Sequence, residues 1–121
     1  MMPVGPATRI YLAAGASDLR QSFEGLSDRV RHQLKEDPLS GHLFVFANRR
    51  KNRVKLLYWD GSGLWVCAKR LEQGCFYWPA TTAADPSALR IAAEELTLLL
   101  SGLDLAKTRG RPWWRQTAGG G

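Results

Sequence analysis

The stretch that decides the fold is residues 43–78, which read LFVFANRRKNRVKLLYWDGSGLWVCAKRLEQGCFYW. Four short runs rich in aromatic and branched residues, which favour strands, occupy positions 43–47, 54–59, 64–68 and 75–78. The segments between them carry Gly, Asn and Asp, which supply the dihedral angles of tight turns. Connections this short make consecutive strands run antiparallel. The stretch therefore predicts a four-stranded antiparallel meander.

The flanking segments predict one further strand and two helices. Residues 9–13 could add a fifth strand, and Ser17 is the expected N-cap of a helix with an apolar stripe from Leu19 to Leu34 that ends before Pro38. Residues 89–91 predict a brief strand followed by a helix over 92–101, with a single longer helix from Pro86 as the alternative. We expect an α+β fold with both helices mainly on one face of the sheet, and the tail or a partner on the other.

Length and composition are typical of one globular domain. The chain has 121 residues, 45% hydrophobic and 23% charged, so we predict a single domain over 1–105 and a basic, Trp-containing, flexible tail over 106–121. It contains no apolar run of transmembrane length, and its start lacks a signal-peptide pattern. The two cysteines are too few for a disulfide framework or a zinc site, which favours a reducing cytoplasm.

The net charge of +6 is concentrated in residues 49–70. Residues 1–48 and 71–121 each contain five basic and five acidic side chains, so they contribute no net charge. A concentrated basic patch is typical of a polyanion-binding surface, although a solvated turn is the simpler alternative. Against Asp60 alone, the window carries Arg49, Arg50, Lys51, Arg53, Lys55, Lys69 and Arg70. In a meander, Lys69 and Arg70 are expected to return beside Arg53.

Catalytic chemistry has little support in the sequence. Two-metal catalysis needs converging carboxylates, whereas Asp60 is the only one in the sheet region and is typical of a turn residue. His32 and His42 have no nearby histidine, which argues against a metal site, and we expect no cofactor. A Cys–His nucleophile pair stays open from sequence alone, with Cys67 more typical of core.

The tail offers a second candidate contact surface. Paired tryptophans among cations could stack on bases or dock in a partner's groove, or they could fold back over the sheet. Of these, folding back or partner docking is favoured over base stacking. The residues concerned are Arg109, Arg111, Trp113, Trp114 and Arg115.

Several segments together resemble a known family. They are residues 17–26 (SDLRQSFEGL), 37–46 (DPLSGHLFVF), 55–65 (KLLYWDGSGLW), 69–72, 76–79 and 98–104. In this order they are similar to the TnpB-type accessory proteins, encoded by the second open reading frame, of the sixty-six family of bacterial insertion sequences. The resemblance covers roughly residues 3–105. It implies a non-enzymatic protein that assists a separate transposase. The family shares only a name with the RNA-guided nucleases called TnpB.

Two functions follow as hypotheses. The first is an accessory factor that binds DNA at the element ends without catalysis, through phosphate contacts from the basic hairpin. The alternative is a protein-interaction module that docks the transposase or other element-encoded proteins and does not contact DNA. Membrane association is not expected, and the sequence leaves the oligomeric state open.

Overall fold

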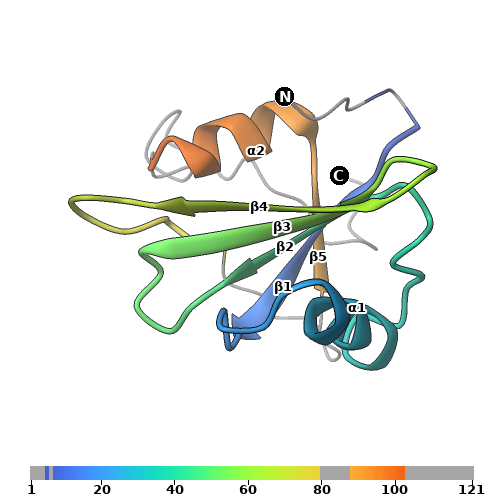
Figure 1. Ribbon diagram of the computed structural model, residues 1–121. Helices are drawn as coiled ribbons and strands as arrows, with labels where there is room; N and C mark the ends of the chain where they lie inside the picture. Colours follow the sequence, from blue (N-terminus) through green and yellow to red (C-terminus); the bar gives the residue numbers. More distant parts are fainter. Residues whose placement is uncertain (1–4, 6, 80–87, 103–121) are drawn as a thin grey trace.

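A computed structural model describes residues 5, 7–79 and 88–102 of the chain. Five strands and two helices follow one another in this part of the sequence (Figure 1). Their order is β1 (Ile10–Ala16), α1 (Phe23–His32), β2 (Leu43–Ala47), β3 (Arg53–Trp59), β4 (Leu64–Arg70), β5 (Ala88–Ile91) and α2 (Ala93–Leu100).

The five strands form one sheet in the order β4-β3-β2-β1-β5. The β2–β3–β4 part is the predicted meander, with Phe44 opposite Leu57 and Leu56 opposite Cys67. β1 joins it as a fifth strand, parallel to β2, and β5 pairs antiparallel with β1 at the far edge. A mostly antiparallel sheet with two helices confirms the α+β prediction.

The two helices lie on opposite faces of the sheet, which corrects the expectation that one face would carry both (Figure 1). Leu26 and Val30 of α1 pack with Phe44 and Leu57 on one face. On the other face, Leu99 of α2 belongs to a second buried cluster. Because β1 and β2 are parallel, the chain must cross over between them, and this crossover contains α1. The apolar character of both sheet faces is therefore satisfied within the chain.

Residues 75–78 are not the fourth strand of the meander. The main chain leaves β4 through a turn at Gly74, whose φ is +76°, and crosses the face that α2 covers. There Phe76, only 1% exposed, joins the core cluster, and its N–H donates to the Lys51 carbonyl at 2.6 Å. The Trp78 indole reaches β1, where Nε1 donates to the Ala13 carbonyl at 2.8 Å. These aromatic side chains complete a core layer instead of extending the sheet.

The first helix begins later than its apolar stripe predicts. Ser17 is not its N-cap: the Ser17 N–H donates to the Ala47 carbonyl at 2.8 Å, beside the β1–β2 pairing. Residues 17–22 form a loop because Asp18 Oδ1 accepts from the Arg20 N–H at 3.0 Å, a local bond that competes with helix formation. Ser22 occupies the N-cap position.

Gly25 in α1 lies close to the loop that precedes the helix. A Cβ at this position would lie 2.8 Å from the Gln21 Cβ.

Helices with the length and apolarity needed to cross a membrane do not occur in the part of the chain that the structure describes.

Candidate nucleic-acid interface

The turn between β2 and β3 is held by the side chain of Asn48. Its Oδ1 accepts from the N–H groups of Asn52 and Arg53, both at 3.1 Å, and its Nδ2 donates to Asn52 Oδ1 at 2.7 Å. Lys51 has a φ of +58°, and its N–H donates to the Asn48 carbonyl. An asparagine is well suited to such a turn because its short amide can bond the backbone nearby. The turn therefore presents its cations from a defined loop.

Strand alternation places three cations on the face that α1 covers. Leu57 packs with the α1 cluster, and side chains two and four residues away share its face, so Arg53 and Lys55 lie there too. Val66 in β4 packs on the same cluster, and Arg70, four residues later, follows the same rule. These side chains lie beyond the region that α1 covers.

Arg53 and Arg70 are directly opposite each other on β3 and β4. Leu71 N–H donates to the Asn52 carbonyl and Asp60 N–H donates to the Gly63 carbonyl. The residue pairs 52–71 and 60–63 therefore occupy hydrogen-bonded positions of the ladder. In an antiparallel ladder these pairs alternate with non-hydrogen-bonded ones, so Arg53–Arg70 is of the second, more closely spaced kind. Like charges in such a pair repel. This is the proximity that the meander topology predicted.

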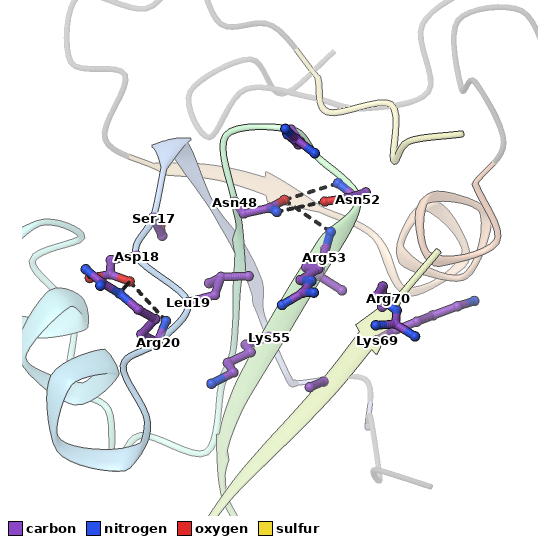
Figure 2. A pocket seen from close by; sticks show the side chains of 13 residues that line it. Ser17, Asp18, Leu19, Arg20, Asn48, Asn52, Arg53, Lys55, Lys69 and Arg70 are labelled. Carbon is purple, nitrogen blue, oxygen red and sulfur yellow. Dashed lines mark hydrogen bonds and ion pairs between the residues drawn. The ribbon is translucent and has the colours of Figure 1, made fainter. Parts of the chain in front are cut away.

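A loop from elsewhere in the sequence closes the other side of this surface. The loop 17–22 runs beside β3, and Lys55 Nζ donates to the Gln21 carbonyl at 2.9 Å. Between the loop and β4 lies a depression of about 660 Å³, which we call the basic depression (Figure 2). Asp18 is the only acidic residue of its lining, and its cations are Arg20, Arg50, Arg53, Lys55, Lys69 and Arg70.

Figure 2 shows how the labelled side chains surround the basic depression. Asp18 and Arg20 lie on one side, Arg53 and Arg70 on the other, and Lys55 between them. The lining has no aromatic side chain; its apolar members are Leu19, Val54 and Ala68. A cationic surface without stacking platforms suits phosphate groups better than bases.

Ion pairing leaves most of this charge uncompensated. Asp18 forms a bidentate pair with Arg20, with both N–O distances 3.0 Å, and Arg70 Nη2 lies 3.3 Å from Glu72 Oε2. Within residues 5, 7–79 and 88–102, Arg53 makes no ion pair. Hydrogen bonds from the Arg20 side chain, and then from its backbone N–H, lower the pKa of Asp18 to about 2. Asp18 is therefore ionised at neutral pH and reduces the local positive potential.

Two predicted residues are not part of the lining. Lys51 extends toward the opposite face, where its Nζ lies 5.7 Å from the centre of the Trp78 ring, and burial lowers its pKa. It is thus a packing and cation–π residue. Arg49 is exposed on the turn but does not line the basic depression. Lys69 does line it, although its Nζ donates to the Leu100 carbonyl at the end of α2, at 2.7 Å.

Arg20 is the cation that charge counting missed. Residues 1–48 are neutral as a whole, and Arg20 was expected within a helix, so nothing marked it as part of the basic surface. The signal available in the sequence was the Asp18-Leu19-Arg20 segment, where an aspartate can bond the backbone two residues on and keep the arginine in a loop. The predicted tail contacts at 109–115 and the tail boundary at 106 lie outside the described residues.

Asp60, the carboxylate of the sheet region, is held by hydrogen bonds within its own turn. Asp60 Oδ1 accepts from the Ser62 and Gly63 N–H groups and Oδ2 from Trp65 Nε1, at 2.7 to 2.9 Å. These bonds, the one from Trp65 first, lower its pKa and assign it to the turn that sequence predicted. A group of three or more potential metal ligands does not occur in the described part of the chain.

His42 connects two segments through its ring. Its Nδ1 accepts from the Arg9 N–H at 3.0 Å, which joins the segment before β1 to the residue before β2. Its ring also packs edge-on against Tyr11, with 6.0 Å between centroids. Burial, followed by the charge of Arg9, lowers its pKa.

The fold and the basic depression define a small α+β protein with a cationic surface suited to phosphates. The chain belongs to the IS66 Orf2-like family: the family model described as "IS66 Orf2 like protein" matches residues 8–110. This match confirms the resemblance seen in the sequence, and the family supports an accessory role for the protein in an insertion sequence.

Two curated relatives come from Sinorhizobium fredii. The chain is 40% identical to uncharacterized protein y4hO over 104 residues, which cover 86% of this chain and 88% of the relative. It is 37% identical to uncharacterized protein y4jC over 116 residues, covering 94% and 97% respectively. No solved structure matches the chain.

Proposed function

We propose that this accessory protein binds DNA without catalysis, through the basic depression and the β2–β3 turn beside it. The observation that carries the proposal is a depression lined by cations from three separate segments, among them Arg20, Arg53 and Arg70, with one carboxylate in its lining. Surface cations that serve only solubility need not converge, and opposite arginines on neighbouring strands repel each other. A polyanion in the basic depression would relieve that repulsion.

Contacts to phosphates are the expected mode of binding. Each Lys or Arg that neutralises a phosphate releases a counterion, so affinity falls steeply as salt rises. Such contacts position a protein on DNA but carry no sequence information. The basic depression has no aromatic lining for base stacking. We therefore expect duplex DNA to bind at low salt, with a small difference between element-end and scrambled sequences.

The test is a salt-titrated mobility-shift assay on element-end and scrambled duplexes, with and without transposase. Retardation of both duplexes at low salt, lost at moderate salt, is the expected result. The proposal fails if the protein retards neither duplex at low salt, or if the variant Arg50→Ala/Arg53→Ala/Arg70→Ala binds as tightly as the original. Arg90→Ala is a control from outside the basic depression because Arg90 is exposed on β5, at the opposite edge of the sheet.

A second candidate function is docking of the transposase without DNA contact. It is favoured by two aromatic side chains that phosphate binding does not use, Trp65, 55% exposed, and Tyr77, 45% exposed. Aromatic side chains of this kind are enriched at protein interfaces. Co-purification with the transposase in the presence of nuclease supports this function. A complex that nuclease abolishes contradicts it.

A further inference from the structure

β4 is an edge strand of the sheet that the described residues form. Leu71 and Gly63, which flank β4, bond to Asn52 and Asp60, which flank β3, so the odd-numbered residues of β4 direct their N–H and C=O groups inward. The even-numbered residues Leu64, Val66, Ala68 and Arg70 direct theirs outward. Seven residues long and exposed or half-buried throughout, β4 offers a template for another strand.

The two ends of this edge differ in chemistry. At its start, Trp65 is 55% exposed, and its Nε1 donates to Asp60 Oδ2 at 2.7 Å. The Asp60 carboxylate also accepts from the Ser62 and Gly63 N–H groups. The Trp65 indole is therefore oriented by these bonds in the single chain. At its end are the cations Lys69 and Arg70. The edge is therefore acidic and aromatic at one end and basic at the other.

We propose that the β4 edge pairs antiparallel with β4 of a second copy of this chain, centred on Cys67. This is the two-fold register in which all seven residues pair. Val66 then lies opposite the partner's Ala68, and Leu64 opposite the partner's Arg70, each pair exchanging both hydrogen bonds because all four groups point outward. The occupant is a second copy because the edge is complementary to itself.

The same register brings the unlike ends together. Lys69 and Trp65 are odd-numbered and share a sheet face, so Lys69 lies directly opposite the partner's Trp65 and near the partner's Asp60. Its Nζ, which donates to the Leu100 carbonyl in the single chain, would exchange that bond for the contact with the partner. An ammonium over an indole and beside a carboxylate is favourable. A parallel arrangement would instead place Lys69 and Arg70 beside their own copies. Charge complementarity thus selects the antiparallel, closed pair.

The pairing keeps the two basic depressions on one face of a continuous sheet. Arg70 and the partner's Arg70 would be separated by six residues along the strands, roughly 20 Å at about 3.4 Å per residue. One duplex could then contact both. The pairing itself does not depend on DNA, so it is tested without nucleic acid and its outcome is separate from that of the proposed function.

The decisive variant is Ala68→Pro. Proline removes an outward N–H and leaves the β3–β4 ladder intact, because it is tolerated on edge strands where the N–H faces solvent. Ala68→Ser is the matched control. By sedimentation equilibrium, the original and Ala68→Ser are expected to dimerise. Ala68→Pro, with a native circular dichroism spectrum, is expected to raise the dimer dissociation constant at least about tenfold.

A second measurement covers the case in which Ala68→Pro does not fold. Cys67 and the partner's Cys67 would form a non-hydrogen-bonded pair, with a Cα separation of about 4.5 Å, within the range that a disulfide spans. Mild oxidation of Cys75→Ser is expected to yield a Cys67-linked dimer that forms faster than in denaturant.

Several outcomes overturn the proposal. A protein that stays monomeric throughout the micromolar range contradicts it. This holds whether the Val66 and Ala68 amide hydrogens exchange freely with solvent or are protected by another segment of the chain. A protein that is monomeric alone and pairs only with the transposase also contradicts it. A dimer that neither Ala68→Pro weakens nor Cys67 links would use another surface.

Discussion

At the scale of single residues, like charges lie close together in the basic depression, and few carboxylates lie near enough to neutralise them. Arg53 faces Arg70 across two strands, Arg20 is paired with Asp18, and Lys55 gives its hydrogen bond to a carbonyl rather than a carboxylate. Neutral hydrogen bonds orient cations without cancelling their charge. Arg53 and Lys55, which have no carboxylate partner among the described residues, thus keep their charge for an outside anion.

Asp18→Asn tests the effect of the single acidic side chain. Removing its charge raises the positive potential of the basic depression, while the amide oxygen still accepts from the Arg20 N–H. We expect DNA affinity at low salt to increase by up to about tenfold, the equivalent of about 1.4 kcal/mol. Fluorescence anisotropy would measure this affinity, with Asp28→Asn, at an exposed position of α1, as the control. Weaker binding by Asp18→Asn would show that its carboxylate is needed to place Arg20.

Lys51→Ala separates folding from binding. Lys51 packs over Trp78, and cation–π contacts contribute about 0.5 to 2 kcal/mol. We expect the free energy of unfolding in urea to fall by about 1 kcal/mol. The salt dependence of DNA binding should change less than it does in Arg53→Ala. An unchanged unfolding free energy together with a large loss of salt dependence would place Lys51 among the phosphate contacts.

At the scale of elements, local chemistry predicted the β2–β3–β4 meander closely, because Asn48, Asp60 and the glycines mark its turns. Three features depend on contacts between distant segments and could not be read locally: the parallel β1–β2 pair, the helices on opposite faces, and the course of 75–78. The aromatic run at 75–78 has strand composition, yet the bond from Phe76 to Lys51 and the reach of Trp78 to Ala13 place it over the core.

We predict a pH dependence of stability from His42, which links the segments before β1 and β2. The pKa of His42 is lowered on folding, chiefly by burial, so the unfolded chain binds a proton more readily than the folded one. Its contribution to stability is present above its unfolded pKa of about 6.5 and is lost as pH falls below it. We expect His42→Gln to flatten the decrease in unfolding free energy between pH 7.5 and 5.

The matched control for this pH dependence is His32→Gln, because His32 is exposed on α1. That variant should retain the pH dependence of the original protein. Equal flattening in both variants, measured by urea titration at each pH, would contradict the assignment to His42.

At the scale of the whole molecule, the fold separates a structural part from a charged one. Two apolar layers, each sealed by one helix, occupy the two faces of the sheet, and the cations gather beyond α1 at the β2–β3 turn and the end of β4. Sequence alone located five of the six lining cations, because they cluster in residues 49–70. Arg20 joins these cations only through the fold. Its loop follows β1, and because β1 is the neighbour of β2, the loop lies beside β3.

Phosphate binding in the basic depression is tested most directly by the slope of log affinity against log salt concentration for duplex DNA. Each phosphate contact contributes about 0.9 to this slope. Relative to the original protein, Arg53→Ala/Arg70→Ala is predicted to lower its magnitude by about 2, whereas Arg31→Ala/Arg90→Ala, with the same change in net charge, leaves it nearly unchanged. Equal slopes for the two double variants would contradict phosphate binding in the basic depression.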